Sequence, residues 1–389
     1  MKRKIIVVIN SRANYGRIKS FLLAAKKHPN IELKIIVGAS ALLYRFGNVV
    51  DIIKKDGFKP ISVVSSIIEG ENPLTMAKST GLGIIELATH FDNIKPDIVL
   101  TVADRFETIA TAIAASYMNI PVAHTQGGEV TGSIDDNVRH AITKLSHIHF
   151  PSTARAQDFL IKMGESKKYI FKTGCPAIDL LTNKNFLKLD PTMFKRYKGT
   201  GPSISALEPY LVVLQHPVTT EYGEGFKQIN LTLKAVRKII NKKNIQCVWL
   251  WPNVDAGSDD VSKGLRVYRE KYNHEKIHFY RNFSPEDYIS LINNSLCLIG
   301  NSSSAIREGS YLGIPAVNIG SRQSDRERGV NVIDVDYDSD KIFSAINKQI
   351  NHGRYKKSFL YGDGKAGFRI ANILAKVDLS IHKKLNYLK

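Results

Sequence analysis

Residues 299–308, Ile-Gly-Asn-Ser-Ser-Ser-Ala-Ile-Arg-Glu, combine residue types that can hold a diphosphate and a ribose. The apolar run 296–299 is typical of a buried parallel strand, and a helix is expected to follow it. Ser302 and Ser303 would then lie in the first helical turn, where backbone N–H groups and the helix dipole favour a phosphate. Glu308, about one turn further, can accept hydrogen bonds from two ribose hydroxyls. The pattern also fits an ordinary helix cap, so this segment alone leaves both interpretations open.

Polar side chains also gather where other apolar runs end. Asp104 and Arg105, for example, follow the run 97–102 after one alanine, Ala103. Because the carboxyl ends of parallel strands meet at one edge of a sheet, such residues are expected to line a ligand site. The other candidates at predicted strand ends, or shortly after them, are His124, Gln126, Glu129, Asp135, Arg139, His216, Asn253, Asp255 and Arg322.

Some of these residues also have simpler explanations. Asp135 fits a helix N-cap, and Arg139 fits a surface position. His147 and His149 are expected to be hydrogen-bonded strand residues without a functional role. The joint placement of so many polar residues at strand ends favours a functional site for Asp104, His216 and Glu308.

Alternating strand and helix patterns predict the elements that position these residues. In the first half, the segments 4–9, 31–37, 97–102 and 121–124 are typical of strands, and helices are expected near 15–27, 107–118 and 137–146. Strand patterns resume at 210–215, 245–251, 276–280, 296–299 and 315–319. The sequence therefore predicts two Rossmann-like, doubly wound α/β domains. The expected boundaries are 1–181 for the first domain, 182–209 for a linker, 210–365 for the second domain, and 366–389 for a C-terminal helix that packs back on the first domain.

The composition excludes several classes of protein. The chain has 389 residues, of which 43% are hydrophobic, which is enough for two cores, and no run approaches the roughly 20 apolar residues of a membrane span. Its net charge of +19 is spread over both halves without a basic tail or a nucleic-acid-binding motif, so neither nucleic acid nor membrane is an expected partner. Three widely spaced cysteines indicate reduced core thiols and a cytoplasmic location.

Longer strings of residues resemble one family, the hydrolysing UDP-N-acetylglucosamine 2-epimerases of sialic-acid and legionaminic-acid synthesis. The resemblance covers nearly the whole chain. Within the family, the chain resembles the epimerase half of the bifunctional animal enzyme in particular. Its motifs are Ser-Arg-Ala-Asn-Tyr-Gly-Arg at 11–17, Asp-Arg-Phe at 104–106, Gly-Gly-Glu at 127–129, Ile-Asp-Asp at 134–136, Arg-His-Ala-Ile-Thr-Lys-Leu at 139–145, Gln-His-Pro-Val-Thr-Thr at 215–220, Pro-Asn-Val-Asp-Ala-Gly-Ser at 252–258, Gly-Asn-Ser-Ser-Ser at 300–304 and Gly-Ser-Arg-Gln at 320–323.

The resemblance implies a GT-B-like fold with the active site in the interdomain cleft, and chemistry without a metal or other cofactor. UDP would leave by anti elimination to give a 2-acetamidoglucal, and water would then add to release N-acetylmannosamine. Asp104 and Asp135 would transfer protons near the sugar, with Arg105 and Arg139 beside them. His216, if protonated, would place positive charge on the departing phosphate. The remaining implied binding residues are Arg12, Ser302 and Ser303 for the diphosphate, Glu308 for the ribose, and Asn253 and Arg322 for the nucleotide side.

One position departs from the family pattern. Many relatives have Glu where this chain has Gln126, and an amide cannot act as a general base. The proton transfers are therefore expected to depend on Asp104, Glu129 and Asp135.

Several alternatives remain. The same reaction on the 2,4-diacetamido-2,4,6-trideoxy sugar of the legionaminic route is one, and a GT-B glycosyltransferase is a more distant one. A non-hydrolysing 2-epimerase and a basic binding module without catalytic activity are the others. The expected partner is a UDP-sugar, and the expected assembly is a homodimer or homotetramer.

Overall fold

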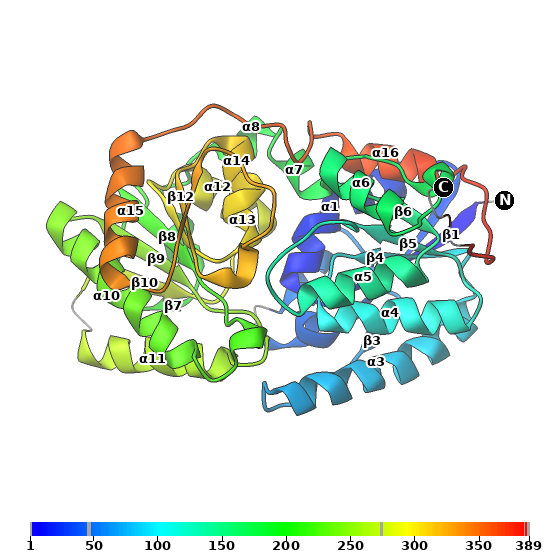
Figure 1. The fold of residues 1–389 in the computed structure, drawn as a ribbon, viewed down its shortest axis with the longest axis horizontal. Coiled ribbons are helices and arrows are strands. Elements are labelled where there is room, and N and C mark those ends of the chain that lie inside the picture. The colour runs from blue at the N-terminus through cyan, green and yellow to red at the C-terminus, as the bar shows by residue number, and fades with distance from the viewer. Residues whose placement is uncertain (1, 45–47, 273–274, 385, 387–389) are drawn as a thin grey trace. The chain divides into compact units, whose positions relative to one another are not determined.

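The computed structural model describes residues 2–44, 48–272, 275–384 and 386, and these form two compact units (Figure 1). The first unit comprises Met1–Val130, Ile134–Thr182 and Tyr361–Lys389, and the second comprises Thr131–Ser133 and Asn183–Leu360. The chain therefore leaves the first unit twice, briefly at Thr131–Ser133 and then for the whole of Asn183–Leu360.

The first unit is built on a parallel sheet. Among the described residues this sheet has six strands in the order β3-β2-β1-β4-β5-β6, and each neighbouring pair is parallel. This is the strand order of a Rossmann-like domain, in which ligands bind beyond the carboxyl ends of the strands. The strands are β1 (Arg3–Ile9), β2 (Ile31–Gly38), β3 (Ser62–Val64), β4 (Ile98–Val102), β5 (Val122–Thr125) and β6 (Ile148–Phe150).

Helices cover both faces of this sheet. Ile5, Val7 and Ile9 of β1 pack with the helices of one face, whereas Ile6 and Val8 pack with those of the other. This alternation follows from the two-residue period of a strand, and it explains why residues 5–9 of β1 are all apolar. The helices of the unit are α1 (Arg12–Lys27), α2 (Val49–Lys55), α3 (Pro73–Ile94), α4 (Phe106–Tyr117), α5 (Asp135–Leu145), α6 (Ala154–Lys162), α7 (Pro176–Leu180) and α16 (Ala366–Leu374).

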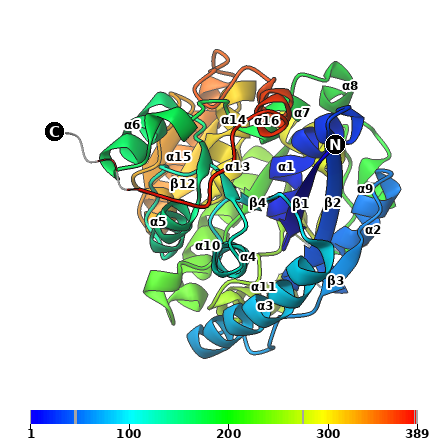
Figure 2. The ribbon, with the colours of Figure 1, turned by 90° about the vertical axis from the view of Figure 1, so that its right-hand side faces the viewer.

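The C-terminal segment returns to the first unit, where α16 packs beside α1 and α7 (Figure 2). The expected helix over 366–389 is wrong in its length, because α16 ends at Leu374. Asp378 and Ser380 follow shortly after it, and such side chains compete for backbone hydrogen bonds and favour turns. Residues 385 and 387–389 of the expected helix lie outside the described residues.

The second unit repeats this architecture with one antiparallel addition. Its described strands form a seven-stranded sheet in the order β13-β12-β11-β8-β9-β10-β7, in which β7 pairs antiparallel with β10 and the other pairs are parallel. The strands are β7 (Gly199–Thr200), β8 (Tyr210–Leu214), β9 (Gln246–Leu250), β10 (Ile277–Tyr280), β11 (Leu298–Gly300), β12 (Ala316–Ile319) and β13 (Val332–Val335).

The faces of the second sheet also separate by alternation. Leu211 and Val213 of β8 pack with one set of helices, and Tyr210 and Val212 pack with the other. The helices are α8 (Lys184–Leu187), α9 (Met193–Arg196), α10 (Gly225–Lys243), α11 (Ser258–Lys271), α12 (Pro285–Asn293), α13 (Ser303–Ile306), α14 (Glu308–Leu312) and α15 (Ser339–His352).

The structure differs from the expected linker over 182–209. Most of this segment belongs to the second unit and contains α8, α9 and β7. Met193 and Phe194 are buried in the core of that unit, where the Phe194 ring contacts Tyr210 edge-on. The segment is polar in composition, but its few large apolar residues bury enough surface to fix it against the sheet.

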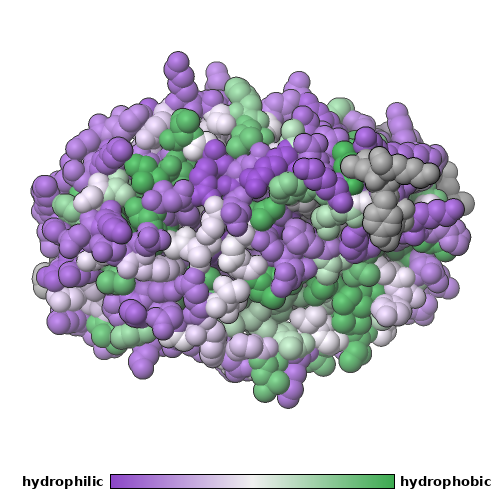
Figure 3. All heavy atoms as spheres, in the orientation of Figure 1, coloured by the Kyte–Doolittle hydropathy of each residue, from purple (hydrophilic) through white to green (hydrophobic). Residues whose placement is uncertain are grey.

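The surface is hydrophilic over most of the face shown in Figure 3, with a green apolar area in the region where Figure 1 places α3. On this helix Leu74 and Ile85 are exposed, and Val63 of the neighbouring β3 is also exposed. Apolar surface of this kind often marks a contact with another protein.

The oligomeric state stays a prediction. Within the described part of the chain, no helix combines the length and the apolar character that crossing a membrane requires.

Candidate active site

The first group of candidate residues surrounds the turn after β4. Ala103 has φ +64°, in the left-handed region, and this places the buried Asp104 beyond the strand end. The Asn14 side chain on α1 fixes the same strand end, because its Nδ2 donates to the Val102 carbonyl over 3.0 Å. A non-glycine residue in this conformation costs energy, which the surrounding hydrogen bonds must offset.

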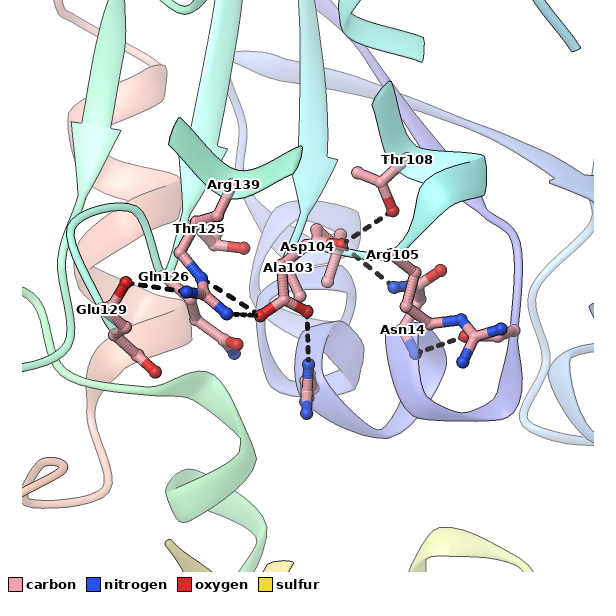
Figure 4. A network of polar contacts seen from close by, with 12 residues as sticks. Asn14, Ala103, Asp104, Arg105, Thr108, Thr125, Gln126, Glu129 and Arg139 are labelled. Carbon is pink, nitrogen blue, oxygen red and sulfur yellow. Dashed lines mark hydrogen bonds and ion pairs between the residues drawn. The ribbon is translucent and has the colours of Figure 1, made fainter. Parts of the chain in front are cut away.

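Arg139 on α5 holds the Asp104 carboxylate. Its Nε lies 3.1 Å from Asp104 Oδ2, and its Nη2 bonds the same oxygen. Its Nη1 donates to the Glu129 carbonyl over 2.7 Å and also bonds Asp136. Figure 4 shows the guanidinium between Glu129 and Asp104. Arg139 has no exposed surface, so the interpretation of it as a surface residue is wrong.

Electrostatics explain why a fully buried arginine is tolerated here. Burial alone would lower the pKa of Arg139, but the carboxylates of Asp104, Glu129 and Asp136 outweigh that effect and raise it. A second cation, Arg17 on α1, has its Nη1 3.7 Å from Asp104 Oδ1. Asp104 is therefore an ionised carboxylate between two guanidinium groups.

His124 lies at the end of β5 and supports the same turn. Its ring has no exposed surface, and its Nε2 lies 3.0 Å from the Ala103 carbonyl. Burial lowers the pKa of His124 to about 3, so the ring is neutral and its Nε2–H donates to that carbonyl. This geometry fits a residue that positions the turn at Asp104. The substrate contact expected from the sequence stays a prediction.

Gln126 follows β5 in a left-handed conformation, with φ +64°. Its Nε2 lies 3.4 Å from the Cys175 sulfur, and its backbone N–H donates to the Phe150 carbonyl over 3.0 Å. Both Gln126 and Cys175 are buried, and Cys175, Cys247 and Cys297 are free core thiols, as expected. The amide of Gln126 does not titrate at ordinary pH, so it cannot act as a general acid or base.

Three other candidates in the first unit have distinct positions. Arg105 forms a bidentate ion pair with Glu107, whose two carboxylate oxygens lie 3.1 Å from Arg105 Nε and Nη2. Arg12 is the first residue of α1, which Ser11 caps. Asp135 is half-buried and is the first residue of α5, where the cap position belongs to Ile134. The expectation that Asp135 fits an N-cap is therefore off by one residue.

In the second unit, the turn after β11 organises the candidate phosphate site. Gly300 has φ +123°, and a Cβ there would lie 2.2 Å from the Leu214 carbonyl oxygen, so only glycine fits. The buried Asn301 follows, and its side chain bonds both backbone groups of His216: Oδ1 accepts from N over 2.7 Å, and Nδ2 donates to O over 2.8 Å. This paired contact ties the ends of β11 and β8 together.

The His216 ring carries its proton on one nitrogen only. The Asn253 backbone N–H donates to His216 Nδ1 over 3.1 Å, so Nδ1 is an acceptor and Nε2 holds the proton. The condition under which His216 would carry a positive charge is therefore not met while Nδ1 accepts this hydrogen bond. The ring can act as a neutral N–H donor, and positive charge for a diphosphate must come from other groups.

The helix after β11 is broken into two parts. Ser302 caps α13, with its Oγ 3.3 Å from the Ser304 N, and Ser303 is the first residue of that helix. Arg307 has ψ −71° and separates α13 from α14, which begins at the half-buried Glu308. The sequence predicts one continuous helix here, so this expectation is wrong.

Arg322 and Asp255 complete the second group. Arg322 Nη2 lies 3.9 Å from Asp255 Oδ2, and Arg322 Nη1 donates to the Asn301 carbonyl over 3.3 Å. Gln323 Nε2 donates to the same carbonyl over 3.1 Å. Asn301 is therefore the residue through which His216 and Arg322 are connected.

No group of three or more His, Cys, Asp or Glu side chains that could hold a metal ion occurs among the residues for which placement is described.

Comparison with known proteins identifies the family. The sequence profile of the UDP-N-acetylglucosamine 2-epimerases matches residues 23–375. The chain belongs to the UDP-N-acetylglucosamine 2-epimerase family. A Legionella pneumophila UDP-N,N'-diacetylbacillosamine 2-epimerase (hydrolyzing) is 34% identical over 379 residues, covering 97% of both chains. A Neisseria meningitidis UDP-N-acetylglucosamine 2-epimerase is 30% identical over 362 residues, covering 93% of this chain and 91% of the relative.

Solved structures of the same family confirm the GT-B-like α/β fold. The crystal structure of UDP-GlcNAc 2-epimerase from Neisseria meningitidis bound to UDP-GlcNAc matches with a TM-score of 0.77 and 20% identity, covering 95% of this chain and 99% of that one. At this identity the likeness shows the fold alone. The resemblance to the epimerase family stated from the sequence motifs is confirmed by the family profile and by the relatives in sequence.

For this member of the UDP-N-acetylglucosamine 2-epimerase family, sequence reasoning missed several residues that support the candidate site. Asn301 was part of a motif, but its paired contact with His216 depends on two strands that are distant in sequence. Asn14 and Arg17 lie one helical turn apart on α1, and this spacing was the available signal that both could reach the end of β4.

Proposed function

We propose that the chain is a hydrolysing 2-epimerase that converts UDP-N-acetylglucosamine and water to N-acetylmannosamine and UDP. Membership of the epimerase family supports the nucleotide-sugar substrate, and the relative with 34% identity, which spans the same length, is named as a hydrolysing enzyme. The observation that carries the proposal is the buried Asp104–Arg139 pair, which sets an ionised carboxylate beyond the end of a parallel strand.

In the proposed elimination, a base removes the proton from carbon 2 of the sugar. The electron pair forms the double bond between carbons 1 and 2, and the bond from carbon 1 to the phosphate oxygen breaks so that UDP leaves. Water then adds its oxygen to carbon 1, and a proton is delivered to the opposite face of carbon 2. Asp104, Glu129 and Asp135 are the proposed proton-transfer groups, because such steps need positioned titratable side chains.

The proposed nucleotide-binding residues belong mostly to the second unit. His216 Nε2–H would donate to a diphosphate oxygen, and its orientation is fixed by the contacts of Asn253 and Asn301 with the same residue. Backbone N–H groups of Ser302 and Ser303 would bind the phosphates, and Glu308 would accept from the ribose hydroxyls.

A second substrate has specific support. The Legionella relative is named for UDP-N,N'-diacetylbacillosamine, and it has a higher identity to this chain than the Neisseria UDP-N-acetylglucosamine 2-epimerase. The two sugars differ at carbons 4 and 6, away from the bonds that change. We therefore propose the 2,4-diacetamido-2,4,6-trideoxy sugar as the alternative substrate for the same reaction.

Isotopic labelling tests the reaction class with either sugar. In heavy water the product should be a free sugar of manno configuration with deuterium at carbon 2, because hydration takes that proton from solvent. In ¹⁸O-water the released UDP should contain no solvent oxygen, since the bond that breaks lies between carbon 1 and its oxygen. Free sugar with unlabelled carbon 2 would indicate a simple hydrolase, and UDP-linked product without free UDP would indicate a non-hydrolysing epimerase. Either result would reject the proposal.

A further inference from the structure

A buried charged cluster lies in the first unit outside the candidate site. Glu165, which follows α6, has a side chain that is only 2% exposed. Its Oε2 lies 2.6 Å from Lys383 Nζ and 3.0 Å from His149 Nε2, and its Oε1 lies 3.0 Å from Lys144 Nζ. An ionised carboxylate this deep in a protein needs such partners, because desolvation would otherwise cost several kcal/mol.

Lys383 belongs to the segment after α16, residues 375–384 and 386, here called the C-terminal strap. Other contacts hold the strap along the unit: Arg3 Nη1 donates to the Val377 carbonyl over 2.8 Å, and the Asn386 N–H donates to the Gly164 carbonyl over 2.8 Å. The Ile381 carbonyl lies 3.2 Å from His147 Nε2. The strap is therefore attached at several points to the first unit.

Lys383 also caps the end of α5. Its Nζ donates to the carbonyls of Thr143 and Ser146 over 2.7 and 2.6 Å. The last carbonyls of a helix have no partner within the helix and carry partial negative charge, so an ammonium group there is favourable. Because α5 also carries Arg139, whose guanidinium fixes Asp104, the position of this helix bears directly on the candidate site.

A second route connects the same end of α5 to Asp104. Thr143 Oγ1 lies 3.5 Å from His124 Nδ1, and His124 Nε2 lies 3.0 Å from the Ala103 carbonyl. Ala103 is the left-handed residue immediately before Asp104. Contacts thus lead from Lys383 through Thr143 and His124 to the turn that presents the carboxylate.

We propose that the C-terminal strap, through Lys383, positions the Asp104–Arg139 pair for proton transfer. Lys383 is a positioning residue in this proposal and does not touch substrate. This inference rests on the proposed function only where it concerns turnover. The effect of Lys383 on the position of α5 and of the Asp104 turn does not depend on any substrate. Small displacements of a positioned catalytic group are expected to cost turnover strongly, because an error of about 1 Å can cost ~10²-fold.

The first test compares Lys383→Met with Lys384→Met. Lys384 is the exposed neighbour of Lys383, so its variant makes the same change of charge one residue away. We expect Lys383→Met to lower kcat by about tenfold or more, with KM and UDP affinity within about twofold of the unmodified protein. Lys384→Met should have no effect. Equal kcat for both variants, measured well below their unfolding temperatures, would overturn the proposal.

A second readout separates this inference from the proposed reaction. Hydrogen exchange of backbone amides should accelerate in α5 and at residues 103–105 in Lys383→Met, and Lys383→Arg should restore part of the protection. Unchanged exchange would reject the strap as a positioning device even if the enzyme acts on another substrate. If the unmodified protein turns over no UDP-sugar, the proposed function fails, and the exchange result alone decides the role of the strap.

Thr143→Val provides a milder variant in case Lys383→Met does not fold. Valine keeps the shape of threonine and the backbone carbonyl that accepts from Lys383, and it removes only the hydroxyl beside His124. It should lower kcat by severalfold and accelerate amide exchange at residues 103–105. If turnover and exchange both match the unmodified protein, the route through His124 is wrong, and the strap must act through the end of α5 alone, which the Lys383→Met comparison decides.

Discussion

Arg139 Nε lies 3.1 Å from Asp104 Oδ2, and Nη2 of the same guanidinium bonds that oxygen as well. One oxygen of the carboxylate is therefore committed to α5, and a proton transfer by Asp104 would use Oδ1. Arg17 Nη1 lies 3.7 Å from Oδ1 and keeps this oxygen in a positive environment. The pair explains how a buried carboxylate remains ionised at the end of a parallel strand.

Arg139→Lys tests this pairing. Lysine keeps the charge but has no planar fork, so it cannot contact Asp104, Asp136 and the Glu129 carbonyl with the same geometry. We expect turnover of the UDP-sugar to fall by ~10²-fold, because Asp104 loses its fixed orientation. Steady-state kinetics and UDP titration calorimetry would measure both effects, and UDP affinity should change by less than about threefold.

The control for this prediction is Arg196→Lys, which changes an arginine of the second unit that pairs with Asp190 and Asp287 near the surface. Exposed ion pairs contribute little, so its turnover should match the unmodified protein. Turnover of Arg139→Lys within a few-fold of this control would show that the guanidinium fork is not needed to position Asp104.

Asp104→Asn tests the carboxylate itself. The amide has nearly the same shape but cannot accept the proton of carbon 2, so turnover should fall by ~10²-fold or more while UDP binding stays nearly intact. Gln126→Ala should cost much less, because the amide of Gln126 takes no part in proton transfer in our proposal. Asp158→Asn, at an exposed position on α6, is the matched control. A larger loss for Gln126→Ala than for Asp104→Asn would reverse this assignment of roles.

The sequence predicted the strands that carry these residues because parallel, buried strands are continuous apolar runs. The run 4–9 became β1 (Arg3–Ile9), and the run 210–215 became β8 (Tyr210–Leu214). The pattern failed where burial is partial: Val63 of β3 is exposed, and β13 (Val332–Val335) contains no buried residue, so neither resembles a core strand. Both are strands at the edge of their sheets.

The missed helix α3 shows a different limit. Its buried face includes Ser79 and Gly83 beside Leu87 and Phe91, so the apolar period is weak over its first half. A Cβ at Gly83 would lie 3.1 Å from the Ala110 Cβ, which shows how closely α3 packs on α4. Small residues that permit close packing carry little hydrophobic signal, and periodicity cannot detect them.

The sequence predicted where along the chain the candidate residues lie. It did not predict their protonation states or the hydrogen bonds and ion pairs between them. Strand ends located Asp104 and His216, because parallel strands bring their carboxyl ends to one edge. The tautomer of His216 depends on the backbone N–H of Asn253, 37 residues away in sequence. The burial of Arg139 depends on carboxylates from three different segments. Such contacts are tertiary and leave no local pattern.

His124 leads to a prediction about pH. Burial lowers its folded-state pKa to about 3, whereas the unfolded value is near 6.5, so the unfolded chain binds more protons between these values. The stability contributed by neutral His124 is therefore fully present above pH 6.5 and is lost as the pH falls towards 3. The expected slope is about 1.4 kcal/mol per pH unit from this residue alone.

Proton uptake on unfolding measures this effect directly. At pH 5.5 the unmodified protein should take up about one proton more than His124→Asn when urea unfolds it in weakly buffered solution. His149, whose pKa burial also lowers, contributes in the same direction in both proteins and cancels in the comparison. Glu165, with its pKa lowered to about 2 by His149 and Lys383 despite burial, takes up its proton mainly below pH 4.5. Equal uptake by both proteins would mean that His124 is protonated in the folded state.

Glu308→Ala tests the proposed ribose contact in the second unit. Glu308 is half-buried at the start of α14, and in the proposal its carboxylate accepts two charge-assisted hydrogen bonds from the ribose. Their loss should weaken UDP binding by roughly 2–4 kcal/mol, which calorimetric titration would detect as a rise of at least about 30-fold in Kd. Glu208→Ala, at an exposed position before β8, is the matched control and should bind UDP normally.

The unmodified protein should bind the 2′-deoxyribose form of UDP more weakly than it binds UDP. Glu308→Ala should bind the two nucleotides almost equally well. If Glu308→Ala discriminates between the two nucleotides as strongly as the unmodified protein does, the ribose is held by another residue.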